Sequence, residues 1–153
     1  MVAFIRRWWR ALVDQVAAFQ QRRIGNAEPG ARPSDDRLSV LRLSDAQKEF
    51  AYHVGCLLVH IGNLPHYTCT LGDAYRDPRV HGKLGEKKSY SSANSRHKER
   101  LAIDINLFYD DVYLRKTEAY KSVGEYWKGL HPDNEWGGDF SNKDGNHLQR
   151  RWP

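Results

Sequence analysis

The sequence predicts an α+β domain, in which helical and strand patterns occupy separate stretches of the chain. Residues 44–61 and 119–130 carry apolar side chains at three- and four-residue intervals, which is typical of amphipathic helices. Residues 67–72 and 101–109 alternate polar and apolar side chains, which is typical of strands. Because 153 residues fit one domain of ordinary size, we expect these elements to share one core.

The N-terminal part of the chain is predicted to stand apart from this domain. Residues 1–24 carry five Arg and one acidic residue, and their apolar side chains recur at helical spacing, so we expect a basic amphipathic helix. The adjacent Trp8 and Trp9 either pack on the domain or on a partner subunit, or lie on an anionic membrane surface. Residues 25–37 are rich in Pro, Gly and polar residues, which predicts a linker and leaves residues 38–153 as the domain.

The first helix of the domain has a start and a stop signal. Ser44 and Gln47 have the spacing of a capping box, which predicts the N-terminus of the helix. Gly62, Asn63 and Pro65 predict its end. The predicted buried face consists of Phe50, Val54, Leu57, Leu58 and Ile61.

Two strands and a long loop follow. The strand at residues 67–72 leads into Tyr75 and Arg76. Residues 77–94 are rich in Lys, Ser and Gly without a helical period, so we expect a loop that is either functional or disordered. In the strand at residues 101–109, successive side chains alternate between two faces. One face carries Ala102, Asp104 and Asn106, and the other carries Ile103, Ile105 and Leu107.

The C-terminal part begins with the second helix, at residues 119–130. Residues 135–152 are Gly-rich first and have a strand-like pattern after Asn146. We expect this last strand to complete the domain.

Composition and charge limit the classes of partner. The chain has 24 Lys and Arg against 19 Asp and Glu, so its surface favours nucleic acid, anionic lipid or an acidic bacterial envelope. Cys56 and Cys69 form neither a C-x-x-C pair nor a dense framework, and we expect free, buried thiols. No apolar run approaches the roughly 20 residues that a membrane-spanning helix needs, and we see no signal-peptide core.

Two imidazoles and two carboxylates come from two distant stretches of the chain. A hydrolytic zinc site needs about three imidazole or carboxylate ligands and one open position for water. His97, Asp104 and His147 meet that number. His97 and Asp104 are seven positions apart, so a turn at residues 98–100 has to bring them together, with Asp104 pointing inward from its strand.

Two further side chains are candidates for catalysis. Asp144 lies three residues before His147, and we expect it beside the metal as the general base. Arg76 is the nearest candidate for stabilising an oxyanion, and its alternative role is a structural ion pair. The prediction depends on the co-occurrence of these groups, because either short pair alone is common in surface loops. The remaining histidines are assigned to packing or to the surface: His53, His60, His66, His81 and His131.

The segment Ser95-x-His97-x-x-Arg100-Leu101-Ala102-Ile103-Asp104 resembles the Ser-x-His-x6-Asp signature of the M15 zinc peptidases. This family includes D-alanyl-D-alanine carboxypeptidases and dipeptidases, and phage endolysins of the L-alanyl-D-glutamate endopeptidase type. Residues 135–147, with Glu-Trp-Gly-Gly-Asp-Phe and Asp-x-x-His, resemble the phage-type members. Tyr75-Arg76 resembles the upstream Arg motif, so the resemblance spans roughly residues 44–152.

The resemblance implies a fold and a set of roles. The fold would be a small antiparallel sheet flanked by helices, the M15 or Hedgehog-like zinc peptidase fold, with an extra N-terminal helix. Three residues would bind Zn²⁺, namely His97, Asp104 and His147. Asp144 would be the catalytic base, and Arg76 would bind the carbonyl. Many carboxypeptidase members have Gly where this chain has Arg100, which leaves substrate specificity open. Further residues expected to face the substrate are Ser95, Glu135, Trp136 and Asp139.

We therefore expect a zinc metallopeptidase that hydrolyses an amide bond in peptidoglycan stem peptides, as a phage or prophage endolysin that degrades the cell wall. It would act on the wall in the periplasm, after release from the host cytoplasm or from a virion. Residues 1–24 would contact an anionic membrane or a virion partner. The alternative is a zinc-containing wall-binding or virion structural module without catalysis. A metal-dependent nuclease is disfavoured because no nucleic-acid motif is visible, so no nucleic-acid partner is expected.

Overall fold

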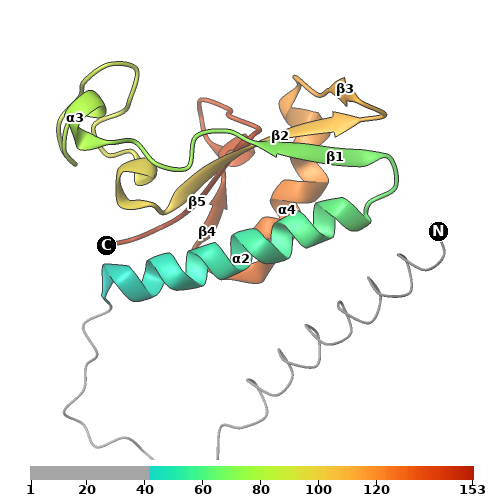
Figure 1. The fold of residues 1–153 in the computed structure, drawn as a ribbon, viewed down its shortest axis with the longest axis horizontal. Helices are drawn as coiled ribbons and strands as arrows, with labels where there is room; N and C mark the ends of the chain where they lie inside the picture. The colour runs from blue at the N-terminus through green and yellow to red at the C-terminus, as the bar shows by residue number, and fades with distance from the viewer. Residues whose placement is uncertain (1–41) are drawn as a thin grey trace, which may run out of the picture. The chain divides into compact units, whose positions relative to one another are not determined.

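The computed structural model describes residues 42–153. The helix predicted at residues 1–24 and the linker at residues 25–37 lie outside this part of the chain. The elements follow one another as α2 (Leu43–Asn63), β1 (Tyr67–Leu71), α3 (Pro78–His81), the 3-10 helix η1 (Arg96–Glu99), β2 (Ala102–Tyr109), β3 (Val112–Tyr113), the 3-10 helix η2 (Thr117–Tyr120), α4 (Lys121–Leu130), β4 (Asn134–Trp136), the 3-10 helix η3 (Gly137–Asp139) and β5 (His147–Arg150) (Figure 1).

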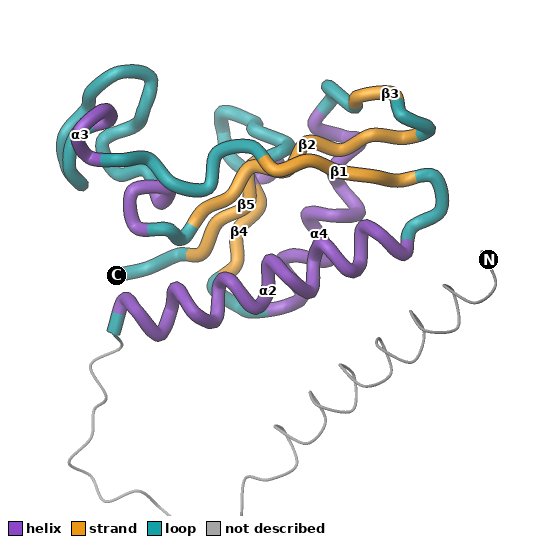
Figure 2. The backbone as a smooth tube through the Cα atoms, viewed as in Figure 1, coloured by secondary structure: helices purple, strands orange, loops and turns teal. Residues whose placement is uncertain are grey.

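The strands form one small antiparallel sheet with the order β1-β2-β5-β4, and the short β3 pairs with β2 (Figure 2). Strand β2 is central: its first half pairs with β5 and its second half pairs with β1. Helix α2 packs against β1 and α4, and α4 packs against β4. The predicted α+β architecture, a small antiparallel sheet flanked by helices, is confirmed.

Strand β2 separates the core from the functional face. Ile103, Ile105 and Leu107 are buried and belong to the hydrophobic core with Leu57 and Ile61 of α2. Asp104 and Asn106 alternate with these residues and therefore project from the opposite face of the strand. Both strand faces are as the sequence predicts, and they place the only carboxylate of β2 away from the helical core.

Trp127 of α4 joins the helices to the C-terminal strands. Its side chain is fully buried and makes an edge-on contact with Phe50 of α2, with 5.4 Å between ring centroids. Its indole N–H donates to the carbonyl oxygens of Glu135 and Gln149, at 3.1 and 3.2 Å. Because the polar atom of this buried ring has partners, the ring fixes β4 and β5 without an unsatisfied donor.

The start of α2 differs from the expected capping box. The helix begins at Leu43, so Ser44 lies inside the first turn and Arg42 occupies the cap without a side-chain hydrogen bond. The Gln47 side chain donates instead to the carbonyl of Glu99, at 2.7 Å. This contact ties α2 to η1, whose residues lead into β2.

Among residues 42–153, none of the helices has both the length and the apolar character that crossing a membrane requires.

The long loop after β1 is ordered around one buried ammonium group. The short helix α3 begins at Pro78 and is capped by Asp77, whose carboxylate accepts from the Arg79 N–H at 2.8 Å. Lys98 of η1 is only 9% exposed. Its Nζ donates to three carbonyl oxygens of the loop, those of Lys83, Glu86 and Ala93, at 3.0, 2.6 and 3.2 Å. Three carbonyls replace the water that a buried ammonium loses.

Candidate metal centre

Three donor atoms converge at the junction of η1, β2 and β5. Oδ1 of Asp104 lies 3.0 Å from Nδ1 of His147 and 3.4 Å from Nε2 of His97. The two imidazole nitrogens lie 3.2 Å apart. These three atoms, called the ligand triangle below, form the one group of potential metal ligands of this kind among the described residues. The structure thus brings together the three residues that the sequence selected as ligands.

The register of the sheet brings two of the three candidate ligands together. Asp104 of β2 and His147 of β5 are directly paired residues on adjacent antiparallel strands. Directly opposed side chains lie on the same face of a sheet, about 5 Å apart at Cβ. The carboxylate and the imidazole therefore meet without any special loop geometry.

A tight turn places the third candidate ligand. His97 lies in η1, and Arg100 reverses the chain into β2 with φ 56° and ψ 36°, the left-handed conformation. The N–H groups of Arg100 and Leu101 close the turn on the carbonyls of His97 and Arg96. The Arg100 guanidinium lies 3.9 Å from the centre of the Tyr75 ring. The turn predicted at residues 98–100 is confirmed, and it places a fully buried imidazole over the start of the strand.

The ligand triangle fits a single divalent cation. Bonds of about 2.0–2.1 Å in tetrahedral geometry separate two ligand atoms by about 3.3 Å. The three observed separations, from 3.0 to 3.4 Å, lie around that value. Two imidazoles and one carboxylate also match the ligand types that zinc accepts in catalytic sites.

The electrostatics of the triangle favour an ionised carboxylate. Burial on its own would raise the pKa of Asp104, but hydrogen bonds from His147 and His97 hold the pKa well below its usual range. Burial likewise would lower the pKa of His147, yet its contacts with Asp104 and Gln149 raise it above the ordinary value. Asp104 is thus negatively charged at neutral pH, the state that a metal ligand requires.

Asp144 lies in a tight turn that leads directly to the candidate ligand His147. Its N–H donates to the carbonyl of Gly137 at 2.9 Å, and its own carbonyl accepts from the N–H of His147 at 3.2 Å. An added Cβ at Gly137 would overlap the Asp144 carbonyl oxygen, so this close approach requires glycine. The Asp144 side chain is exposed, and its charge contributes to the raised pKa of His147. The predicted base therefore lies within electrostatic reach of the triangle.

Trp136 supports this turn from the core. It is 4% exposed, and its indole N–H donates to the Gly145 carbonyl at 2.7 Å. Its ring lies so close to Gly124 and Gly138 that a Cβ at either position would overlap it. The sequence placed Trp136 among the residues that face the substrate, whereas the structure places its ring in the core and its N–H against the turn that carries Asp144.

Arg76 is bonded to the backbone of His97 and is held from several sides. Its backbone N–H donates to the His97 carbonyl at 3.2 Å. Its guanidinium donates to Asp73 at 3.2 Å and to the Ser95 hydroxyl at 3.1 Å, and it lies 5.1 Å from the centre of the Tyr90 ring. The ion pair that was the alternative role for Arg76 is therefore present. Sequence reasoning selected Arg76 and Ser95 and missed the partners Asp73 and Tyr90.

Glu135 and Asp139, which the sequence predicts to face the substrate, each accept a hydrogen bond from another side chain of the domain. Glu135 accepts from the Gln149 amide at 2.7 Å. Asp139 accepts from Lys128 of α4 at 2.6 Å and is exposed. Gln149 was not singled out from the sequence, although its place two residues after His147 puts both side chains on one face of β5.

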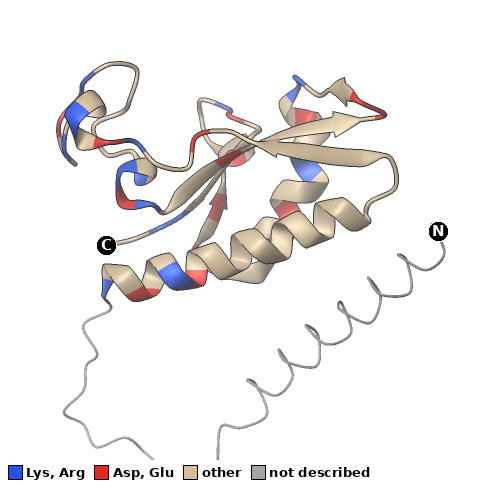
Figure 3. Ribbon diagram, viewed as in Figure 1, with Lys and Arg blue, Asp and Glu red and all other residues tan. Residues whose placement is uncertain are grey.

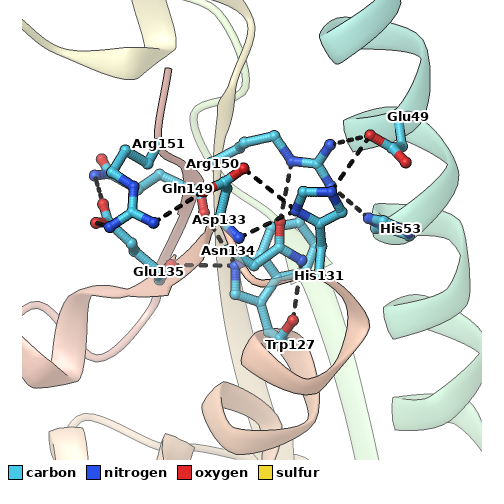
Figure 4. A network of polar contacts seen from close by, with 10 residues as sticks. All are labelled: Glu49, His53, Trp127, His131, Asp133, Asn134, Glu135, Gln149, Arg150 and Arg151. Atoms are coloured by element: carbon cyan, nitrogen blue, oxygen red, sulfur yellow. Dashed lines mark hydrogen bonds and ion pairs between the residues drawn. The ribbon is translucent and has the colours of Figure 1, made fainter. Parts of the chain in front are cut away.

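A second polar network lies between α2 and the C-terminal strands (Figure 4). Arg150 is buried, and its guanidinium bonds to Glu49, His53 and Asn134. The His53 imidazole accepts from this guanidinium, and its pKa is lowered by burial and by the adjacent positive charge. His53 is therefore a packing residue, as the sequence predicts.

Part of the chain is similar to a known protein family. Residues 89–150 match the M15 family model described as D-alanyl-D-alanine carboxypeptidase. No curated protein matches the chain. Among solved structures, the L-Ala D-Glu endopeptidase ChiX of Serratia marcescens is similar, with 16% sequence identity, a TM-score of 0.49, and coverage of 72% of this chain and 87% of that chain. The matched segment contains the whole ligand triangle, so the similarity to the M15 peptidases falls on the candidate metal centre itself.

Proposed function

We propose that the chain is a zinc-dependent peptidase that hydrolyses an amide bond in peptidoglycan stem peptides. The observation that carries the proposal is the ligand triangle, whose separations of 3.0–3.4 Å suit one tetrahedral cation. The family match over residues 89–150 supports peptidase chemistry on the same residues.

His97, Asp104 and His147 would hold the zinc ion. When bound, zinc lowers the pKa of a coordinated water and polarises a carbonyl. Asp144 would accept the proton of the attacking water and later donate it to the leaving amine. Its exposed carboxylate and its electrostatic action on His147 support this role.

Arg76 would bind the carbonyl oxygen of the scissile amide. A donor that is fixed before the reaction stabilises developing negative charge without a reorganisation cost. The hydrogen bonds to Asp73 and Ser95 and the ring of Tyr90 fix the guanidinium in this way. Its backbone bond to the His97 carbonyl couples its position to that of a ligand.

We further propose a role as a phage or prophage cell-wall lysis enzyme. The resemblance of residues 135–147 to phage-type members supports this role. The net charge of +5 suits an acidic bacterial envelope as the target.

The test combines metal analysis with product analysis. Purified chain is analysed for zinc by mass spectrometry, and purified peptidoglycan is digested and its fragments are identified by liquid chromatography and mass spectrometry. We expect stoichiometric zinc and cleavage at one amide bond of the stem peptide, lost with a chelator and restored by zinc. Zinc binding without cleavage would support the wall-binding alternative and contradict the peptidase. Plasmid DNA, incubated in parallel, should remain intact.

A further inference from the structure

Behind the ligand His147, two side chains continue the polar contacts away from the triangle. The Nε2 atom of His147 lies 3.0 Å from Oε1 of Gln149. The amide nitrogen of Gln149 donates to Oε2 of Glu135 at 2.7 Å. Glu135 of β4 and Gln149 of β5 are directly paired in the sheet, so this chain of contacts spans two neighbouring strands. Figure 4 shows Glu135 and Gln149 close to Arg151, at the end of the network away from α2.

The chemistry of these groups fixes the direction of each hydrogen bond. An ionised carboxylate can only accept, so the Gln149 group that faces Glu135 has to be the NH₂ group. The Gln149 oxygen then faces His147, and the His147 nitrogen nearest to it has to donate. At the far end of these contacts, the other oxygen of Glu135 lies 3.9 Å from the Arg151 guanidinium. Nε2 of His147 therefore carries a proton, and the proton that Nδ1 donates to Asp104 is the one that a metal ion would displace.

Holding the proton on Nε2 leaves Nδ1 to act as the ligand atom. Nδ1 is the atom of His147 that points into the ligand triangle, 3.0 Å from Asp104 and 3.2 Å from His97. A ligating histidine commonly donates its other N–H to a neighbouring acceptor, which fixes the orientation of the ring and makes the ligand nitrogen more basic.

We propose that Gln149 and Glu135 are positioning residues that hold His147 in the orientation and tautomer that bind a metal ion through Nδ1. The inference rests on the proposed metal site and deepens it. Gln149 contacts the ligand, and Glu135 acts through Gln149 by fixing which end of the amide faces the imidazole. Neither residue touches the ligand triangle through its described contacts.

The backbone of the same two residues offers a matched control. The Trp127 indole donates to the carbonyls of Glu135 and Gln149, and it makes no bond to their side chains. Trp127→Phe removes this backbone support and leaves the chain of side-chain contacts in place. Loss of zinc affinity through general damage to β4 and β5 should therefore appear in Trp127→Phe as well.

The test measures zinc affinity by competition with a chelator of known affinity, at one pH, on the full chain. We expect Gln149→Leu to weaken zinc binding by about 10- to 100-fold, the usual effect of losing such a partner. Gln149→Glu alone sets two carboxylates against each other and should also weaken binding. In the double variant Glu135→Gln with Gln149→Glu, the new carboxylate accepts from His147 and from the new amide, so zinc affinity should return toward that of the wild type.

The outcomes separate this inference from the proposed function. Recovery in the double variant, with Trp127→Phe lowering the melting temperature more than the zinc affinity, supports the positioning role. Equal zinc affinity in all variants would overturn it while leaving the metal site intact. An equal loss in Trp127→Phe and Gln149→Leu would also overturn it, because the effect would then be structural. Zinc binding by the wild type without hydrolysis would contradict the peptidase and leave the positioning role standing.

Discussion

Asp104 and His147 occupy paired positions on adjacent strands, and 3.0 Å separates the carboxylate oxygen Oδ1 from the imidazole nitrogen Nδ1. Their meeting follows from the register of β2 and β5. A slip of one residue would turn one of the two side chains to the opposite face of the sheet. The site is therefore built into the sheet, and only His97 depends on a turn.

We expect Asp144→Asn to abolish hydrolysis and to leave zinc bound. Asparagine keeps the size of the side chain but cannot accept a proton, and loss of a general base typically costs about 100- to 10,000-fold in rate. Steady-state kinetics on a defined stem peptide, with zinc analysis of the same sample, measures both effects. Asp45→Asn, an exposed change on α2, is the control that should keep full activity. Full activity in Asp144→Asn would remove Asp144 as the base.

His97→Ala should lose both the metal and the stability that the metal confers. His97 supplies one of the three atoms of the ligand triangle, and metal binding to the folded state adds to the free energy of unfolding. The melting temperature of the wild type should rise on addition of zinc, and that of His97→Ala should not. His66→Ala, at an exposed histidine outside the triangle, should respond like the wild type. An unchanged zinc content in His97→Ala would exclude His97 as a ligand.

The effect of an Arg100 substitution on stability should depend on the backbone conformation more than on the loss of charge. Arg100 adopts a left-handed conformation that costs a residue with a Cβ about 1 kcal/mol, whereas glycine adopts it freely. Both Arg100→Gly and Arg100→Ala lose the contact with Tyr75. We expect Arg100→Gly to be more stable than Arg100→Ala by about 1 kcal/mol in urea unfolding, because the strain exceeds the extra entropy of glycine in the unfolded chain. A more stable Ala variant would contradict this.

The contribution of His53 to the stability of the fold should decrease as the pH falls below the ordinary histidine pKa of 6.5. Burial and the Arg150 guanidinium lower the pKa of His53, so the unfolded chain takes up a proton that the folded chain refuses. His53 thereby favours the unfolded state at low pH, whereas His147, whose pKa is raised, favours the folded state there. His53→Asn keeps an acceptor for Arg150 and cannot titrate, so the variant should lose less unfolding free energy than the wild type when the pH falls.

Urea unfolding of the wild type and of His53→Asn is measured at about pH 7.5 and about pH 5.5. A chelator is present, so that metal binding does not contribute to the difference. A wild type and a His53→Asn variant with identical pH dependence would exclude His53 as a source of the effect.

Deletion of residues 1–30 should slow the action on intact envelopes more than the hydrolysis of soluble muropeptides. The sequence predicts a basic amphipathic helix in this part of the chain, and such helices bind anionic surfaces. We expect the shortened chain to cleave soluble muropeptides at the wild-type rate and to act more slowly on intact envelopes. Turbidity of a cell suspension and chromatography of muropeptide products give the two rates. Equal action of both chains on envelopes would contradict a membrane role.

Periodicity was enough to predict the elements that bury a long apolar face. The helices at Leu43–Asn63 and Lys121–Leu130 and the strands at Tyr67–Leu71 and Ala102–Tyr109 all lie where their apolar spacing predicts them. The last strand, His147–Arg150, follows Asn146 as expected. Strands β3 and β4 have two and three residues, which is too short for an alternating pattern to appear.

Side-chain roles were harder to predict than elements. The ligand set could be selected because imidazole and carboxylate have few other reasons to recur in this combination. Trp136 was assigned to the substrate side, because a motif gives no information on whether an aromatic ring faces a groove or the core. Gln47 has the spacing of a capping residue, yet its amide bonds to the Glu99 carbonyl 52 positions away. Such long-range partners depend on tertiary packing, which local spacing does not encode.

Lys98 follows the candidate ligand His97 directly on the same turn, and its ammonium lies among the carbonyls of the loop that precedes it. Any displacement of that turn therefore moves the anchor of the loop together with His97. We expect a cation bound to His97 to restrain residues 83–93 as well, so that a protease would cleave the metal-free protein faster at this loop.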